Sequence, residues 1–468
     1  MKQLKRPNVL LIYTDQQRWD SLKCYGNDLV KTPNLDRLAE EGALFEHSYV
    51  QNPFCMPSRM SMLTSQYPGN LGIGTNGIPA PNDRLLVHQV LKPYGYHAAN
   101  IGKLHFSPHV SRDHKDCHPT YDFDTLILSD EPGCYDDAYT KWVEELNPSM
   151  LERVRTSLPP AAFKYNHTEY SKIPRETHEP YVFQGEDRLT HSAFIASETC
   201  SFLEANRNNR FFAIAGFYAP HTPVNPPQKY VNMYNLDNIP YPRMGPDDEF
   251  LPFLKEVPRE HWKKVIAHYL ALVTHVDECV GEILNKLDEL GLSQDTLVIF
   301  TSDHGEYLGD HGRIQKGWPG HDVIIRVPLI MRYPRKIKRN LRISNLVESV
   351  DIVPTIIDYC GIQQPNSFQG MSLRPLIEGR TDKHKDEVIV DMFNPRGYRG
   401  TTIRTDKYKY YLDTDGNEFL FDLENDSNEF YNLAQKEKYK EIVSDMRKSM
   451  IIRLQQVCYR NQNQVAEY

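Results

Sequence analysis

Five short and largely apolar runs constrain the fold of this chain more than any other feature of its sequence. They are "NVLLIY" (8–13), "HAANIG" (97–102), "FFAIAGFY" (211–218), "TLVIFTS" (296–302) and "VPLIM" (327–331). Longer segments of helical periodicity, such as 32–45 and 265–291, lie between them. Short continuous apolar runs are typical of strands that are buried on both faces of a parallel sheet. The pattern predicts an α/β fold in which a large, mainly parallel sheet is flanked by helices.

The length of the chain and the change in its predicted secondary structure near residue 385 predict two structural units. At 468 residues it exceeds what a single hydrophobic core usually supports. From about residue 385 the long helical segments give way to short β-like pieces and a polar helical tail. We therefore predict a large α/β domain over 1–384 and a small C-terminal α+β subdomain with an antiparallel sheet over 385–468. The polar stretch 107–190 is predicted to be an insertion over the functional face of the large domain.

Composition argues against several classes of partner. The net charge of −8 arises from 54 basic and 62 acidic residues, and without a dense Lys/Arg block nucleic acid is not expected as a partner. No apolar run approaches the roughly 18 residues of a membrane span, and the run 9–13 is too short for a signal-peptide core. We expect a cytoplasmic chain with no membrane partner, and a homo-oligomer is left open. The eight cysteines lack paired or metal-finger spacing, which predicts free thiols.

Polar side chains that suit chemistry follow four of the predicted strands. In chain order they are Asp15 and Gln16, Lys103 and His105, His221, and Asp303 and His304. Each of them alone would be an ordinary turn, cap or surface residue. In open α/β sheets, however, ligands bind beyond the carboxyl ends of the strands. Four strand ends that carry carboxylates, imidazoles and an amine therefore predict one common site.

The stretch "TSDHGEYLGDHGRIQKG" (301–317) offers two Asp-His pairs as metal ligands. Hard carboxylate oxygens together with an imidazole suit a divalent cation. Asp303 and His304 leave a predicted strand directly, so we favour them over the competing pair Asp310 and His311. Lys316 follows in the same stretch and is predicted to return a cation to the same pocket.

"CMPSR" at 55–59 resembles the C-x-P-S-R signature of the sulfatases, the formylglycine-dependent enzymes of the alkaline phosphatase superfamily. Further likeness lies in "TDQQ" after the first strand, the segment 32–50, "GKLHF" at 102–106, "APHTP" at 219–223, "SDHGEYLGDHG" and "IRTDKYKYYL". The resemblance spans nearly the whole chain and is weakest between about 107 and 200. It implies an alkaline-phosphatase-like fold and hydrolysis of a sulfate ester to an alcohol and inorganic sulfate.

The resemblance implies a modified residue at Cys55. In sulfatases of this pattern a formylglycine-generating enzyme oxidises the cysteine to an aldehyde, whose hydrate carries two hydroxyl groups on one carbon. One hydroxyl attacks sulfur and displaces the alcohol, and loss of the proton from the other then releases sulfate. Pro57 and Arg59 belong to the pattern that the converting enzyme reads, and Arg59 would also stabilise the formylglycine oxygens. A reduced, buried Cys55 ahead of a helix is the alternative.

The resemblance also implies roles for the residues at the strand ends. One divalent metal would be bound by Asp15, Gln16, modified Cys55, Asp303 and His304. The sulfate oxygens would be bound by Lys103, His105, His221 and Lys316. A general acid would protonate the leaving oxygen, and the sequence leaves the choice among His105, His221 and Lys316 open.

Gln16 departs from the common pattern, since many sulfatases have a second aspartate at this position. In this respect the chain resembles the branch that contains choline sulfatases and phosphonate monoester hydrolases. The neutral amide removes one negative charge beside the cation. Calcium is the expected metal, with manganese and magnesium as alternatives.

Two other functions remain alternatives on sequence grounds. A phosphonate monoester or phosphodiester hydrolase would use the same nucleophile, metal and cations, since both transferred groups are tetrahedral oxyanions. A non-catalytic binding protein on this scaffold would lack the nucleophile or the metal ligands, and this chain has both. The expected substrate is a sulfated small molecule, with a saccharide preferred over an aryl or choline sulfate. Segments 107–190 and 219–260 are expected to line its pocket.

Overall fold

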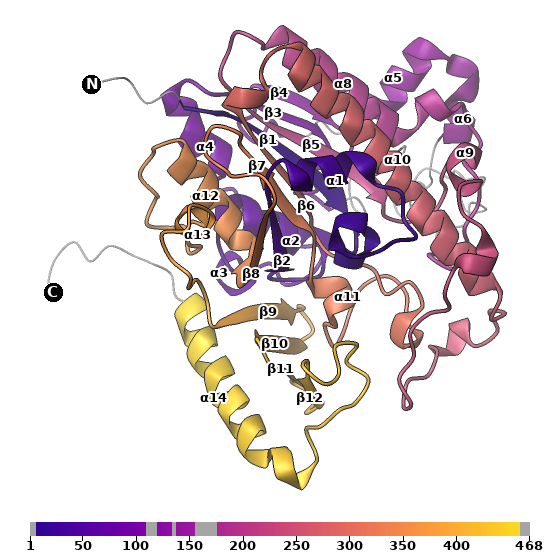
Figure 1. The fold of residues 1–468 in the computed structure, drawn as a ribbon, viewed down its shortest axis with the longest axis vertical. Coiled ribbons are helices and arrows are strands. Elements are labelled where there is room, and N and C mark those ends of the chain that lie inside the picture. Colours follow the sequence, from indigo (N-terminus) through magenta and orange to yellow (C-terminus); the bar gives the residue numbers. More distant parts are fainter. Residues whose placement is uncertain (1–5, 109–118, 133–136, 155–175, 459–468) are drawn as a thin grey trace, which may run out of the picture.

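The large sheet of the protein contains eight strands (Figure 1). The computed structural model describes residues 6–108, 119–132, 137–154 and 176–458. In sheet order the strands are β4 (Thr125–Leu128), β3 (His97–Gly102), β5 (Phe211–Pro220), β1 (Asn8–Asp15), β6 (Thr296–Ser302), β7 (Leu329–Arg332), β2 (Ala43–Tyr49) and β8 (Leu341–Glu348). Neighbours pair in parallel except around β7, which is antiparallel to both β6 and β2. The predicted α/β fold with a mainly parallel sheet is confirmed.

The middle strands are apolar on both faces because both faces are buried. β1 pairs with β5 on one side and with β6 on the other, and β3 lies beyond β5. Along β1, Leu10 and Ile12 pack into one hydrophobic core, whereas Val9 and Leu11 pack into another. Successive side chains of a strand point to opposite faces, so an unbroken apolar run is stable only between two covering layers.

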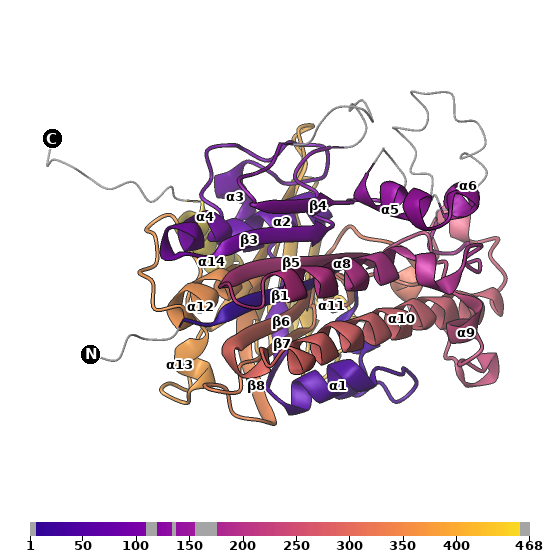
Figure 2. The same ribbon diagram turned by 90° about the horizontal axis from the view of Figure 1, so that it is seen from above.

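Helices form those two layers (Figure 2). One face of the sheet packs against α1 (Pro33–Glu40), α8 (His191–Ala205) and α10 (His261–Glu289). The other packs against α2 (Cys55–Thr64), α4 (Val87–Leu91), α12 (Ile352–Tyr359) and α13 (Arg374–Ile377). Connecting segments contain α3 (Pro68–Leu71), α5 (Ala138–Leu146), α6 (Leu151–Val154), α9 (Gln228–Val231) and α11 (Asp322–Ile325). Within the described ranges, no helix is both long and apolar enough to cross a membrane.

A separate antiparallel sheet of four strands follows in the chain. In sheet order it consists of β12 (Glu418–Asp422), β11 (Tyr408–Asp413), β10 (Arg399–Thr405) and β9 (Glu387–Phe393). On this sheet α14 (Lys440–Val457) packs Met446 and Met450 against Ile403 and Tyr410. Val388 of β9 packs instead against a cluster from the large domain. The small C-terminal sheet and the helical tail that the sequence predicts are both present.

The expectation of one helix over 32–45 is wrong. α1 ends at Glu40, and β2 begins at Ala43 after a turn. A Cβ atom at Gly42 would lie 2.2 Å from the carbonyl oxygen of Met331 on β7, so only glycine allows this close approach. The chain therefore enters the sheet beside β7 instead of extending the helix.

The predicted insertion 107–190 contains β4, α5 and α6 in its described part. Its residues 109–118, 133–136 and 155–175 lie outside the described residues. β4 pairs in parallel with β3 and extends the large sheet at one edge. At least this part of the segment therefore belongs to the sheet itself.

Candidate active site

The carboxyl ends of four neighbouring strands meet at one edge of the large sheet. β3, β5, β1 and β6 are consecutive and parallel, so their C-terminal ends lie side by side. Asp15 is the last residue of β1, while Lys103, His221 and Asp303 follow β3, β5 and β6 directly. The tertiary structure thus brings together residues from four separate parts of the chain.

Cys55 reaches the same place from the opposite layer. It is the first residue of α2, and all ten residues of this helix are buried, which restricts its movement. Its Sγ lies 2.7 Å from Lys316 Nζ and 3.2 Å from His304 Nε2. Asp15 Oδ1 is 3.7 Å from the same sulfur. The N-terminus of α2 adds the positive end of its dipole at Cys55.

This environment favours negative charge at residue 55. Burial raises the pKa of the Cys55 thiol, but the cations of Lys316 and Lys103 with the His304 imidazole outweigh burial and bring that pKa well below its ordinary value. For Lys316, burial lowers the pKa, and the nearby Cys55 and Asp15 charges raise it above its ordinary value. The same field would stabilise a nucleophilic oxygen or a bound oxyanion at this point.

Two buried ion pairs surround Cys55. Arg59 Nε lies 2.7 Å from Asp303 Oδ2, and Lys103 Nζ lies 2.5 Å from Asp15 Oδ2. All four of these side chains are buried. Arg59 also donates to the carbonyl oxygen of Lys103 at 3.1 Å. Because loss of one partner would leave an uncompensated buried charge, these pairs strongly constrain the geometry of the site.

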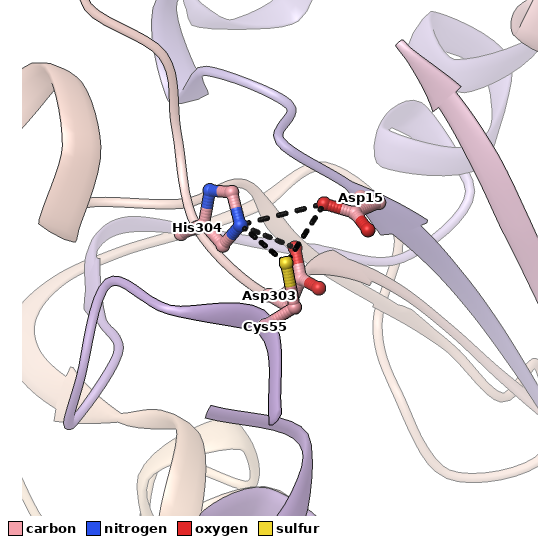
Figure 3. Close-up of side chains that lie close together, drawn as sticks. All are labelled: Asp15, Cys55, Asp303 and His304. Atoms are coloured by element: carbon pink, nitrogen blue, oxygen red, sulfur yellow. Dashed lines mark hydrogen bonds and ion pairs between the residues drawn. The ribbon is translucent and has the colours of Figure 1, made fainter. Parts of the chain in front are cut away.

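A cluster of four buried ligand atoms, all within 4.8 Å of one another, forms the centre of the site (Figure 3). The four residues are Asp15, Cys55, Asp303 and His304. His304 Nδ1 lies 2.8 Å from the carbonyl oxygen of Gly305, so Nδ1 is the protonated nitrogen and Nε2 offers its lone pair to the cluster. Burial and the neighbouring Asp15 raise the pKa of Asp303, and a cation between the two carboxylates would remove this repulsion.

Gln16 adds a further candidate ligand atom. Its backbone N–H donates to Asp303 Oδ1 at 3.1 Å, and its carbonyl oxygen accepts from the Tyr269 hydroxyl at 2.7 Å. Its side-chain Nε2 donates to Glu306. Its Oε1 is buried and has no hydrogen-bond partner in the described part of the chain. An unsatisfied buried amide oxygen beside two carboxylates is what a site for a divalent cation requires, so the residues present fit a metal.

Two histidines come from the loops after β3 and β5. Asp130 Oδ1 accepts the backbone N–H of His105 at 2.7 Å, and His105 has a φ of 57°. From this position its side chain hydrogen-bonds to Cys55. His221 Nδ1 lies 2.7 Å from the carbonyl oxygen of Thr222, so Nδ1 is the donor and Nε2 is the second functional nitrogen of the ring.

The competing pair Asp310 and His311 does not join this cluster. Asp310 Oδ2 lies 2.9 Å from Arg18 and 2.7 Å from Arg243. His311 Nδ1 lies 3.0 Å from Asp248. Both members of the pair therefore have charged partners of their own, and the geometry agrees with the preference for the pair at the end of β6.

Two residues of the site escaped the sequence argument. Asn76 Nδ2 lies 3.9 Å from Cys55 Sγ, and Asn76 Oδ1 accepts the N–H of Met56 at 3.0 Å. Asn76 comes from an irregular loop after α3, where asparagine is an ordinary turn residue, so no pattern indicates it. Glu306 contacts Gln16 and is fully buried. Its only signal in the sequence is its closeness to the Asp-His pair at the end of β6.

Comparisons with known proteins identify the family of the chain. A family model described as Sulfatase matches residues 7–362. A second model, described as N-sulphoglucosamine sulphohydrolase, C-terminal, matches residues 309–456. An arylsulfatase of Clostridium perfringens is 29% identical over 96% of this chain and 95% of its own length. An N-acetylglucosamine-6-O-sulfatase of Bacteroides thetaiotaomicron is 28% identical over 94% of this chain and 84% of its own length.

A solved structure supports the same architecture. The phosphonate monoester hydrolase of Silicibacter pomeroyi matches with a TM-score of 0.81 at 23% sequence identity. The match covers 99% of this chain and 97% of that protein. The alkaline-phosphatase-like fold that the sequence predicts is therefore confirmed.

Proposed function

From the premise that this chain belongs to the sulfatase family and is a sulfuric ester hydrolase, we propose that it releases inorganic sulfate from a sulfated saccharide at the Cys55 site. Residue 55 would provide the nucleophile, and Arg59 would stabilise it. The sulfate oxygens would be bound by Lys103, His105, His221 and Lys316. Asn76 lies against the same sulfur atom and would contact the sulfate group as well.

The observation that carries this proposal is the balance of buried charge around Cys55. Arg59 and Lys103 each have a carboxylate partner, at 2.7 and 2.5 Å. Lys316 has no carboxylate within 4.0 Å among the described residues, and its Nζ faces Cys55 Sγ at 2.7 Å. Apart from the charge that a bound metal would add, Lys316 is the cation left to pair with the transferred group, which suits the single negative charge of a sulfate monoester. A phosphate monoester carries about two negative charges at neutral pH.

Two groups that the family implies would complete the site. A divalent metal, which we propose to be calcium because most of the ligand atoms are oxygens, would be bound by Asp15, Gln16, Asp303, His304 and residue 55. It would supply positive charge that favours deprotonation of a hydroxyl group and polarises the sulfuryl oxygens. Formylglycine at residue 55 would supply, as its hydrate, a hydroxyl nucleophile in place of the thiol.

The side chains of the protein then control the leaving group. When the ester S–O bond breaks, the departing alcohol oxygen gains negative charge and needs a proton. In an in-line displacement this oxygen lies opposite the nucleophile. Lys316 and His105 both contact Cys55 and so lie on the side of the nucleophile. His221 comes from the loop after β5, is half-buried and has no described contact with Cys55. We therefore assign the proton transfer to His221. His221→Ala should therefore slow an alkyl sulfate more than an activated aryl sulfate.

The names of similar proteins support a saccharide as the alcohol. The Bacteroides relative is named for an N-acetylglucosamine 6-O-sulfate, and the C-terminal family model is named for an N-sulphoglucosamine. A sugar also offers several hydroxyl groups away from the reacting bond, whose binding can orient the sulfate group. We therefore propose a sulfated amino sugar as the substrate class.

A substrate panel on enzyme with fully converted residue 55 tests the proposal. We expect kcat/KM for an aryl sulfate to exceed that for the aryl phosphate with the same leaving group. Sulfated glucosamines should exceed both. A consistent preference for a phenyl phosphonate or a phosphodiester with the same leaving group would instead assign this chain to the phosphonate monoester or phosphodiester hydrolases.

A further inference from the structure

We propose that Glu306 is a positioning residue that orients the side-chain amide of Gln16, so that the amide oxygen and not the nitrogen faces the metal site. The inference rests on the metal site proposed above and goes beyond it, because Glu306 is not itself a ligand. It assigns a function to a buried carboxylate that adjoins the site but has no contact with Cys55, Asp15 or Asp303 among the described hydrogen bonds.

The amide of Gln16 needs such a partner because its two ends are nearly identical in shape. The oxygen accepts and can bind a cation, whereas the NH2 group only donates and would repel one. A half-turn of the amide exchanges the two. A metal site that uses glutamine as a ligand therefore depends on a neighbour that distinguishes the oxygen from the nitrogen.

Glu306 makes that distinction because all its contacts are with donors. Its Oε2 accepts from Gln16 Nε2 and, at 3.2 Å, from the Thr177 hydroxyl. Its Oε1 accepts from the backbone N–H of Leu308 at 2.9 Å and from the backbone N–H of Gln315. The side chain is completely buried, so water does not compete for these contacts. A carboxylate offers acceptors only, and Gln16 must therefore present its NH2 group to it.

The backbone of Gln16 is held in place by contacts of its own. Its φ of 65° lies in the left-handed region, which is uncommon for a residue with a side chain. Its N–H is bound to Asp303 and its carbonyl oxygen to Tyr269. With the backbone fixed at both ends and Nε2 bound to Glu306, Oε1 is the one remaining polar atom, and it is the buried atom without a partner in the described structure.

An isosteric change separates this role from simple packing. In Glu306→Gln, the N–H groups of Leu308 and Gln315 still require an oxygen, so the introduced NH2 group must face Gln16. Gln16 then turns its own oxygen toward that group and presents its NH2 group to the cation. We expect Ca²⁺ affinity to fall about 10- to 100-fold, the usual effect of losing a partner that orients a ligand.

The reciprocal change should restore the site. In the double variant Gln16→Glu with Glu306→Gln, the introduced amide donates to one carboxylate oxygen at position 16, and the other oxygen faces the cation. Most of the lost Ca²⁺ affinity should return. Thr177→Val is the matched control, because it removes the other donor to the same Glu306 oxygen but leaves the Gln16 contact in place. The Ca²⁺ affinity of Thr177→Val should equal that of the wild type.

The measurement is calorimetric titration of CaCl2 into the chelator-treated full chain, with thermal unfolding of each metal-free variant to verify folding. Gln16→Ala should weaken binding, and adding Glu306→Gln to it should weaken binding no further. The proposal is overturned if Glu306→Gln binds Ca²⁺ as the wild type does while Gln16→Ala does not, or if the double exchange binds as weakly as Glu306→Gln alone. If the wild type binds no Ca²⁺, or if Gln16→Ala binds it normally, the proposed metal site itself fails.

Discussion

Two clusters of buried charge occur in this protein, and they differ in whether their members satisfy one another. The first surrounds Cys55 at the ends of the parallel strands. The second lies where the large domain meets the C-terminal segment, and its central cation is Lys385. Lys385 Nζ lies 2.6 Å from both Glu348 and Asp351, whose side chains are fully buried.

In the cluster around Lys385, several donors serve the carboxylates. Glu348 accepts hydrogen bonds from the Tyr67 hydroxyl at 2.5 Å, from Arg453 at 3.0 Å and from the N–H of Ile389 at 3.0 Å. Asp351 accepts from the N–H groups of Met371 at 2.8 Å and Glu348 at 3.0 Å. The two carboxylates are thus satisfied without a further ligand, and the network joins distant segments of the chain.

The Cys55 cluster is unsaturated by the same criteria. Gln16 Oε1 has no partner, and Lys316 has no carboxylate partner, among the described residues. Burial and the neighbouring Asp15 charge raise the pKa of Asp303 above its ordinary value. Burial of charge is common to both clusters, so burial alone does not identify the site. The unpartnered Gln16 oxygen and the Lys316 cation distinguish the first cluster from the carboxylates of the second, and a bound ion or anion is one explanation for such buried groups.

The largest effect should follow from removing the proposed nucleophile of the unsaturated cluster. Cys55→Ala should lower turnover by at least about 10⁴-fold, since loss of a covalent nucleophile removes the reaction path and not only a contact. Peptide mass analysis of the converted wild type should show an aldehyde in place of the thiol. Cys200→Ala, which alters a half-buried cysteine on α8, is the control and should retain activity. Near-normal turnover by Cys55→Ala would refute the assignment.

A smaller effect on activity, through loss of the metal, is expected at Asp303. Asp303→Asn should lower metal affinity by more than about 100-fold, since even an indirect partner of a ligand contributes about 10- to 100-fold. Asp303 also pairs with Arg59 at 2.7 Å, so the metal-free melting temperature should fall as well, because the buried guanidinium loses its carboxylate partner. Metal analysis and calorimetry test both parts. A variant that melts early but retains metal would show that this cluster is structural.

The opposite result is expected for the saturated cluster. Lys385→Met should reduce the free energy of unfolding by about 3 to 5 kcal/mol, because it leaves two buried carboxylates without their shared cation. The kcat of the remaining folded protein should be unchanged. Lys229→Met is the control, since Lys229 and its partner Glu278 are each about half exposed, at 46% and 50%, and the change should cost less than about 1 kcal/mol. A loss of kcat without a loss of stability would contradict this division.

The smallest effect concerns pH. It distinguishes a loss of stability at low pH from a loss of activity at low pH. Burial, with a contribution from Lys229, lowers the pKa of His275 on α10 from 6.5 to about 3. Between these values the unfolded chain binds a proton that the folded chain does not, so the stability present above pH 6.5 is lost as the pH falls. By pH 5 this protonation of the unfolded chain lowers the free energy of unfolding by about 2 kcal/mol.

His275→Asn should flatten this part of the stability profile in urea titrations at pH 7.5 and pH 5. The pH dependence of kcat, measured where both proteins remain folded, should not change, because His275 contacts Thr190 and Tyr230 rather than the site. A shift in the kcat profile would indicate that His275 is coupled to the Cys55 site.

The elements of the fold that depend on local pattern were predictable. Apolar runs correctly located β1, β3, β5, β6 and β7, because a strand buried on both faces leaves an unbroken apolar signature. The segment 32–45 was not predictable in the same way. Its helical pattern continues past Glu40, and the close contact of Gly42 with β7 ends the helix. That contact joins residues far apart in the chain, so no local pattern reports it.

The residues of the site were likewise predictable only where they depend on local sequence. The sequence alone determined that Asp15, Lys103, His221 and Asp303 follow buried parallel strands, and parallel strands must deliver such residues to one edge of the sheet. Only the tertiary structure decided which Asp-His pair stands beside Cys55, that Asn76 lies against the sulfur, and that Glu306 binds the amide of Gln16. The physical reason is the separation along the chain of the residues that interact. Periodicity and strand ends arise from neighbours along the chain, whereas charge balance and unmet hydrogen bonds arise between segments that meet only when the sheet has formed.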